Sequence, residues 1–175
     1  MLLTAGAGGQ TGWLKPFAFV RGGAGVLRRA AGAGRGVSDG HALYAAQALG
    51  CDLAYVGTRF IAIDESMARP GYKHMLADSS ADDVMLTAAL TGLPTNLLRP
   101  SIVAAGLDPD NLPARGAIDI AADISVEAYE ARPKRWRDVW SAGHSVSGVD
   151  AVLPVADLVA RTLAEYRAAR GSSCQ

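Results

Sequence analysis

The segment DLAYVGTRF, residues 52–60, decides how the rest of the sequence is interpreted. Residues 52–57 form a nearly continuous apolar run of strand length, which is typical of a strand buried on both faces. Gly57 ends this run and Thr58 follows it. A glycine and a hydroxyl at the end of a buried strand can bring N–H and O–H donors to an anion such as phosphate. A turn with an N-cap would use the same two residues, so this segment alone leaves both readings open.

Helix and strand patterns alternate along the chain around this segment. Residues 38–50 predict a helix, with Ser38 or Asp39 as its N-cap and Gly50 just past its end. Residues 2–6 and 83–87 predict further strands. This alternation predicts an α/β fold with a parallel sheet and right-handed crossovers. In such folds the ligand sites lie at the carboxyl ends of the strands.

The second half of the chain is harder to assign. We expect a helix around residues 71–76 and two helical pieces over 94–106, separated by Pro100. Residues 139–150 predict a strand followed by a loop. A long helix begins after Pro154, because apolar side chains recur there at helical spacing.

Composition and charge limit the function classes. The chain has 175 residues, of which 50% are hydrophobic and 19% charged, as expected for one globular domain. Lys+Arg and Asp+Glu both number 17, so we expect neither nucleic acid nor an anionic membrane as a partner. Cys51 and Cys174 lack CxxC spacing and are expected to be free thiols in the cytoplasm. No metal-ligand spacing is present, and no signal peptide or membrane span is predicted.

Five segments together resemble, in order, the second half of nitronate monooxygenases, formerly called 2-nitropropane dioxygenases. The resemblance covers nearly the whole chain except residues 22–36, and the strand–GTRF segment followed by TGLPTN is its most specific part. The segments are AGAGGQTG (5–12), GVSDGHALYAAQALGCDLAYVGTRFIAIDES (36–66), YKHML (72–76), DDVMLTAALTGLPTNLLRPS (82–101) and SAGHSVSGV (141–149).

This resemblance implies an FMN-binding TIM-like (β/α)8 barrel of roughly twice this length, with a smaller inserted lobe. Residues 1–170 would form the C-terminal portion of that barrel, incomplete as given, and 171–175 would be a disordered tail. The resemblance places the FMN phosphate against the loops after the later strands. The matching positions are Gly36, Tyr55, Val56, Gly57 and Thr58, and Gly8 matches a glycine close to the flavin.

Gln10 departs from the pattern of the family that the chain resembles. That pattern is AGGH, with the histidine as catalytic base, whereas residues 7–10 read AGGQ. A carboxamide cannot titrate near neutral pH, but it can donate a hydrogen bond to a nitronate oxygen. We therefore place Gln10 at the catalytic position. The alternatives are a different substrate or a loop amide that holds the backbone.

Residues 22–36, GGAGVLRRAAGAGRG, predict neither helix nor strand. Three of them, Arg28, Arg29 and Arg35, would have to enter a buried strand. One permitted codon choice for this run, read one base later, encodes AVREFFDGPLVLAGG, which contains a turn and an apolar strand. We therefore hypothesise a local frameshift over 22–36. The competing reading is a natural Gly/Ala/Arg-rich loop insertion.

The resemblance implies an FMN-dependent enzyme that oxidises alkyl nitronates with molecular oxygen, with a nitronate or nitroalkane as the small-molecule substrate. Two alternatives remain. The chain could be a non-catalytic truncated fragment of such an enzyme. It could also be a related flavin-dependent enoyl reductase, although that family would be expected to carry the histidine that Gln10 replaces.

Overall fold

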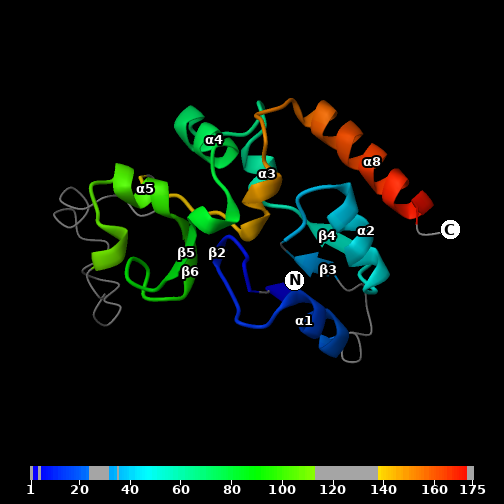
Figure 1. Ribbon diagram of the computed structural model, residues 1–175, viewed down its shortest axis with the longest axis horizontal. Coiled ribbons are helices and arrows are strands. Elements are labelled where there is room, and N and C mark those ends of the chain that lie inside the picture. Colours follow the sequence, from blue (N-terminus) through cyan, green and yellow to red (C-terminus); the bar gives the residue numbers. More distant parts are fainter. Residues whose placement is uncertain (1, 4, 24–31, 35, 113–137, 173–175) are drawn as a thin grey trace.

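A computed structural model describes residues 2–3, 5–23, 32–34, 36–112 and 138–172 (Figure 1). Its first sheet is parallel and has the order β1 (Leu2–Leu3), β3 (Gly32–Gly34), β4 (Leu53–Tyr55). Helix α1 (Pro16–Gly23) lies between β1 and β3 in the chain, and α2 (Gly40–Ala48) lies between β3 and β4. The predicted α/β fold with parallel strands is therefore confirmed for these elements.

A second sheet is antiparallel and has the order β2 (Gly9–Gln10), β6 (Thr95–Leu98), β5 (Val84–Thr87). The predicted strand at 83–87 is confirmed, but the predicted helix over 94–98 is wrong. Residues 95–98 pair along their whole length with β5, and this pairing overrides the local pattern. Pro100 starts α5 (Arg99–Ala104) rather than breaking a helix, since its fixed φ suits the first turn.

Short helical pieces lie between β4 and β5 and after α5. They are α3 (Thr58–Ile61), α4 (Pro70–Ala77) and the 3₁₀ turns η1 (Ala81–Asp83), η2 (Pro109–Asn111) and η3 (His144–Gly148). The strand predicted at the start of 139–150 is wrong. Residues 139–143 are irregular, and η3 follows them directly.

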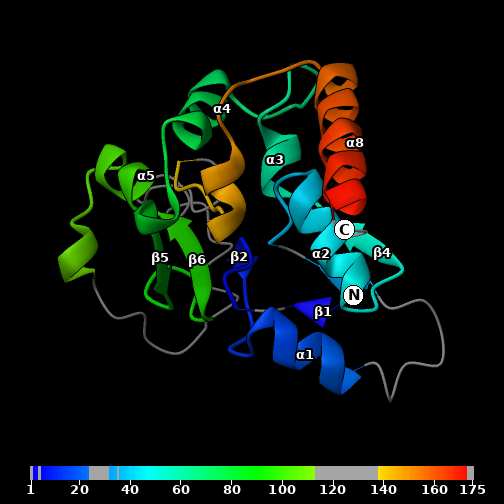
Figure 2. The ribbon, with the colours of Figure 1, turned by 45° about the vertical axis from the view of Figure 1, so that its right-hand side comes forward.

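Helix α8 (Val155–Ser172) begins after Pro154, as predicted, and packs beside α2 (Figure 1, Figure 2). The two backbones approach closely at Gly40. A Cβ atom there would collide with both the Thr162 carbonyl oxygen and the Tyr166 nitrogen. The helix continues through Ser172, so the first two residues of the predicted tail are helical. Residues 173–175 lie outside the described part of the chain.

Three groups of buried apolar side chains form the core. One joins α3, α4, β6 and η3, one lies under α2, and one lies under α5. Their buried members are Ala62, Leu76, Leu98, Ala142, Val146 and Val149; Val20, Val37, Ala46 and Cys51; and Leu97, Ile102 and Val139. Cys51 is buried in the group under α2. Cys174 lies outside the described residues, so the expectation of two free thiols stays a prediction.

Strand β4 does not have the two buried faces that its apolar sequence predicts. Leu53 and Tyr55 are 66% and 55% exposed, whereas Ala54 packs against the group under α2. β4 is an edge strand of this sheet, and among the described elements only the face that carries Ala54 is covered.

The prediction that residues 22–36 contain neither helix nor strand is wrong at two places. Helix α1 extends to Gly23, and β3 occupies 32–34. Parallel pairing to both neighbours gives Gly-Ala-Gly its strand geometry despite a low intrinsic preference for strands. Residues 24–31 and 35, with Arg28, Arg29 and Arg35, lie outside the described residues, and the frameshift stays a hypothesis.

Candidate functional site

The three parallel strands end at one level. Leu3 is aligned with Gly34, and Gly34 with Tyr55. Gly36 and Gly57 each come two residues after an aligned position, so the loops that contain them leave the same edge of the sheet. This carboxyl edge is where parallel α/β folds bind their ligands.

A cavity of about 160 Å³ opens at this edge. Four of the predicted site residues, Gly8, Tyr55, Gly57 and Thr58, line it together with Ile61, Ser141 and Ser145. The structure thus brings together the glycine-rich loop near the start of the chain and the loop that follows β4.

Three predicted site residues do not line this cavity. Val56 packs against the apolar group under α2. Gly36 is exposed, with φ +97°, and an added Cβ atom would meet no heavy atom within 4 Å. Gln10 is also exposed and lies on β2, opposite Thr95 of β6.

Thr58 contributes a buried hydroxyl to the cavity wall. The side chain is 8% exposed, and its Oγ1 accepts a hydrogen bond from the Gly143 N–H at 3.1 Å. An oxygen that accepts in this way can still donate its own hydrogen to a ligand. Ser141 and Ser145 add two further hydroxyls that the sequence analysis missed, although both lie in the segment SAGHSVSGV.

Segment 142–144 holds the glycine-rich loop in place. A Cβ atom at Gly8 would lie 2.7 Å from the Gly143 nitrogen and 2.9 Å from the Ala142 carbonyl carbon. The His144 N–H donates to the Gly6 carbonyl at 2.9 Å, and its imidazole lies against Gly6, whose φ is +78°. This contact needs glycine at position 6, because another residue would be strained there and would meet the ring.

Asn96 also holds this loop. This buried side chain donates from Nδ2 to the Ala7 carbonyl at 2.6 Å, next to the pairing of β2 with β6. The sequence analysis missed Asn96 because it placed residues 94–98 in a helix. Gln10 therefore stands on a short strand whose backbone is fixed by β6.

Comparison with known proteins adds to this geometry. A family model described as nitronate monooxygenase matches residues 30–165, which is more than half of the chain. The chain belongs to the nitronate monooxygenase family. The resemblance identified from the sequence motifs is thereby confirmed.

One curated relative and two solved structures show how far the similarity of this chain extends. A nitronate monooxygenase of Paraburkholderia phytofirmans is 32% identical over 135 residues, which cover 75% of this chain and 36% of that relative. The solved structure of FabK from Thermotoga maritima has a TM-score of 0.72 at 23% identity, covering 95% of this chain and 53% of the other. A nitroalkane oxidase from Streptomyces ansochromogenes has a TM-score of 0.69 at 25% identity, covering 95% and 51%.

This nitronate monooxygenase family member spans only part of the length of the relatives that it matches. The matched region spans about a third of the curated relative (36%) and about half of the solved chains (53% and 51%). Within the described residues, α8 and the shorter helices are too short or too polar to cross a membrane.

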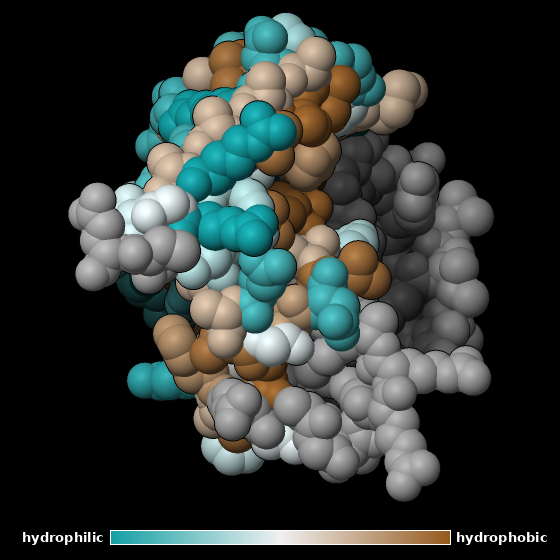
Figure 3. All heavy atoms as spheres, turned by 90° about the vertical axis from the view of Figure 1, so that its right-hand side faces the viewer, coloured by the Kyte–Doolittle hydropathy of each residue, from teal (hydrophilic) through white to brown (hydrophobic). Residues whose placement is uncertain are grey.

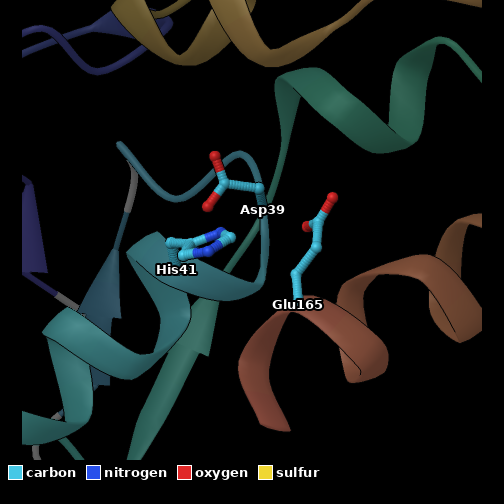
Figure 4. Close-up of side chains that lie close together, drawn as sticks. All are labelled: Asp39, His41 and Glu165. Carbon is cyan, nitrogen blue, oxygen red and sulfur yellow. The ribbon is translucent and has the colours of Figure 1, made fainter. Parts of the chain in front are cut away.

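One cluster of side chains in this family member was missed by the spacing argument. The ligand atoms of Asp39, His41 and Glu165 all lie within 4.8 Å of one another (Figure 4). The Asp39 Oδ1 accepts from the Ala42 N–H at 2.8 Å, which confirms the predicted N-cap. We assign the cluster to helix capping, because a cation there would face the positive end of α2.

An apolar groove of about 330 Å³ runs between α2, α3 and α8. Val159 and Leu163 at its rim are 52% and 43% exposed. Figure 3 shows the face that carries α8, where apolar side chains lie between polar ones. The other apolar residues that line the groove are Val37, Leu43, Val56, Phe60 and Leu158.

Proposed function

We propose that this chain is part of an FMN-dependent oxidoreductase that oxidises alkyl nitronates with molecular oxygen. The observation that carries this proposal is the cavity at the carboxyl edge of the sheet, where Gly8, Tyr55, Gly57 and Thr58 meet. In a member of the nitronate monooxygenase family, this is the position that the motif resemblance assigns to the cofactor.

The residues of the cavity fit a phosphate group. The hydroxyl side chains of Thr58, Ser141 and Ser145 line it, and no carboxylate is among its described lining residues. Gly57 leaves room for a ligand, because an added Cβ atom would meet no heavy atom within 4 Å. A cavity of about 160 Å³ suits a phosphate with its attached carbon rather than a whole flavin.

Each cofactor-binding residue has a proposed place around FMN. Thr58 and the loop at Gly57, with Tyr55 and Val56 before it, would hold the phosphate. Gly8 would lie beside the flavin ring, and Gly36 would approach the phosphate from the neighbouring loop.

Gln10 is proposed to orient the substrate. When bound, FMN would accept the electrons of the substrate and deliver them to oxygen. A nitronate is already an anion, so its oxidation needs no base, and the Gln10 amide can donate to a nitronate oxygen. A neutral nitroalkane must first lose a proton, and an amide cannot remove it.

We also propose that residues 1–170 form the C-terminal portion of a TIM-like (β/α)8 barrel. The parallel order of β1, β3 and β4 and the TM-scores of 0.72 and 0.69 support this architecture. The likeness to FabK at 23% identity shows the fold alone. We propose the cytoplasm as the compartment, because the spacing of the two cysteines in the sequence does not indicate a disulfide framework.

The test is an FMN titration of the 175-residue chain, followed by anaerobic mixing with propyl-2-nitronate or 2-nitropropane. We expect saturable FMN binding and bleaching of the flavin absorbance by the nitronate. Thr58→Val should weaken FMN binding, whereas Thr58→Ser, which keeps the hydroxyl, should not. Absence of FMN binding, or bound FMN that the nitronate does not reduce, would contradict the proposal.

A further inference from the structure

A chain of charged side chains connects the helices that follow the two proposed phosphate loops. Arg59 comes directly after Thr58 and is 2% exposed. Its guanidinium donates to the Ala151 carbonyl at 2.8 Å and to the Asp150 carboxylate at 3.2 Å. The second residue of α3 is thus bound to the segment that leads into α8.

Helix α8 continues the chain of contacts. Arg161 donates from Nη1 to the second oxygen of Asp150 at 2.6 Å and from Nε to Glu165 at 3.0 Å. Charges therefore alternate from Arg59 through Asp150 and Arg161 to Glu165, so every neighbouring pair attracts. A bond from Arg161 to each carboxylate fixes the orientation of both.

Glu165 ends the chain of charges at α2. Its Oε2 accepts the N–H of Gly40, the first residue of α2, at 2.9 Å. Gly40 also contacts the backbone of α8 directly, and only a residue without a side chain leaves room for this contact. The loop of Gly36 leads into this helix, so α8 holds the start of α2 by both a hydrogen bond and packing.

We propose that Arg161 and Glu165 are positioning residues that set the distance between the Gly36 loop and the Gly57–Thr58 loop. This inference rests on the proposed function, because it assigns both loops to the phosphate of FMN. Arg161 and Glu165 lie on the outer helix and do not line the cavity. They act through the first residues of α2 and α3, which carry the two loops.

Riboflavin separates positioning from general stability, because it has the flavin ring of FMN but no phosphate. The experiment compares dissociation constants for FMN and riboflavin, measured by flavin fluorescence with the 175-residue chain. Glu165→Ala and Arg161→Ala should each raise the FMN constant about tenfold, as expected for a displaced loop. The riboflavin constant should change less than about twofold. Arg167→Ala, at an exposed site on the same helix, should change neither.

Circular dichroism shows whether each variant is folded. If Glu165→Ala unfolds, Glu165→Gln takes its place in the comparison, because it keeps the side-chain volume. The amide introduced by Glu165→Gln can still accept from Gly40 but has no charge toward Arg161, so we expect a smaller loss of FMN affinity with the same selectivity. Equal losses for FMN and riboflavin, or unchanged FMN binding in folded variants, would overturn this inference alone. A wild-type chain that binds no FMN would overturn the proposed function and this inference together.

Discussion

Gly8 and Gly57 line the same cavity, but packing requires glycine at only one of them. A methyl group at Gly8 would collide with the backbone of Ala142 and Gly143, whereas one at Gly57 would enter open space. We expect Gly8→Ala to lower the free energy of unfolding by about 1–3 kcal/mol, as overpacking does. Gly57→Ala should change it by less than about 0.5 kcal/mol. Urea denaturation of the two variants measures the difference, and equal losses would contradict the close approach seen at Gly8.

Gln10 is the residue at which a single substitution should change the substrate. We expect Gln10→His to permit use of neutral nitroalkanes, since a correctly placed base contributes typically about 10²–10⁴-fold. Nitronate turnover should stay within about tenfold, because it needs no base. The measurement is the ratio of anaerobic flavin reduction rates with 2-nitropropane and propyl-2-nitronate, and Gln10→Asn is the control. An unchanged ratio would mean that position 10 does not face the substrate carbon.

At the scale of elements, β3 is the strand of the parallel sheet whose sequence has the lowest intrinsic preference for strands. It is the middle strand, yet its sequence is Gly-Ala-Gly. The alternative reading frame would place Val, Leu and Ala at these three positions. We expect replacement of residues 22–36 by AVREFFDGPLVLAGG to raise the thermal midpoint, because β-branched and larger apolar side chains favour a central strand. A matched replacement that keeps Gly-Ala-Gly at 32–34 is the control, and equal midpoints would argue against the frameshift.

Elements with local signals were predictable, and elements that depend on distant pairing were not. The helix at α2 was predicted because Asp39 caps it and Gly50, with φ +98°, ends it. The strand at β6 was missed, because TNLLRPSIV has an apolar pattern that suits a helix equally well. Its pairing with β5 and with the short β2 decides its conformation, and no local window of sequence contains that pairing.

The same distinction applies to the candidate site. Gly8, Tyr55, Gly57 and Thr58 carry recognisable motifs and meet at one cavity. Ser141, Ser145 and Asn96 lie in segments that carry the family resemblance, but no local pattern indicates their role. Their place depends on how segments far apart in the sequence pack against the loops. Charged residues on α8 were missed for the same reason, since an exposed helix face is usually only solvated.

For the whole molecule, the charge network predicts an acid-sensitive contribution to stability. The hydrogen bond from Arg161 holds the pKa of the Asp150 carboxyl below its usual value, and Arg59 adds to this. Because the folded-state pKa is the lower one, this stabilisation is fully present above the pKa of the unfolded chain. It is lost as the pH falls through the folded-state pKa.

We therefore expect Asp150→Asn to be less stable than wild type at pH 7, by a modest amount because the carboxylate is half exposed. The difference should shrink as the pH falls below about 4. Urea midpoints at about pH 7 and about pH 3 measure it, with Asp78→Asn, at an exposed site on the end of α4, as the control. A difference of the same size at both pH values would contradict the contribution of the Asp150 charge.

The bond between Gly40 and Glu165 also has a consequence for synthesis. It joins residues that are 125 positions apart. A ribosome that adds about 5–20 residues per second needs roughly 6–25 s to make the chain between them. During that time α2 and the loop before it exist on the nascent polypeptide without the helix that later braces them. Cofactor capture is therefore expected to follow the synthesis of α8 rather than that of α2.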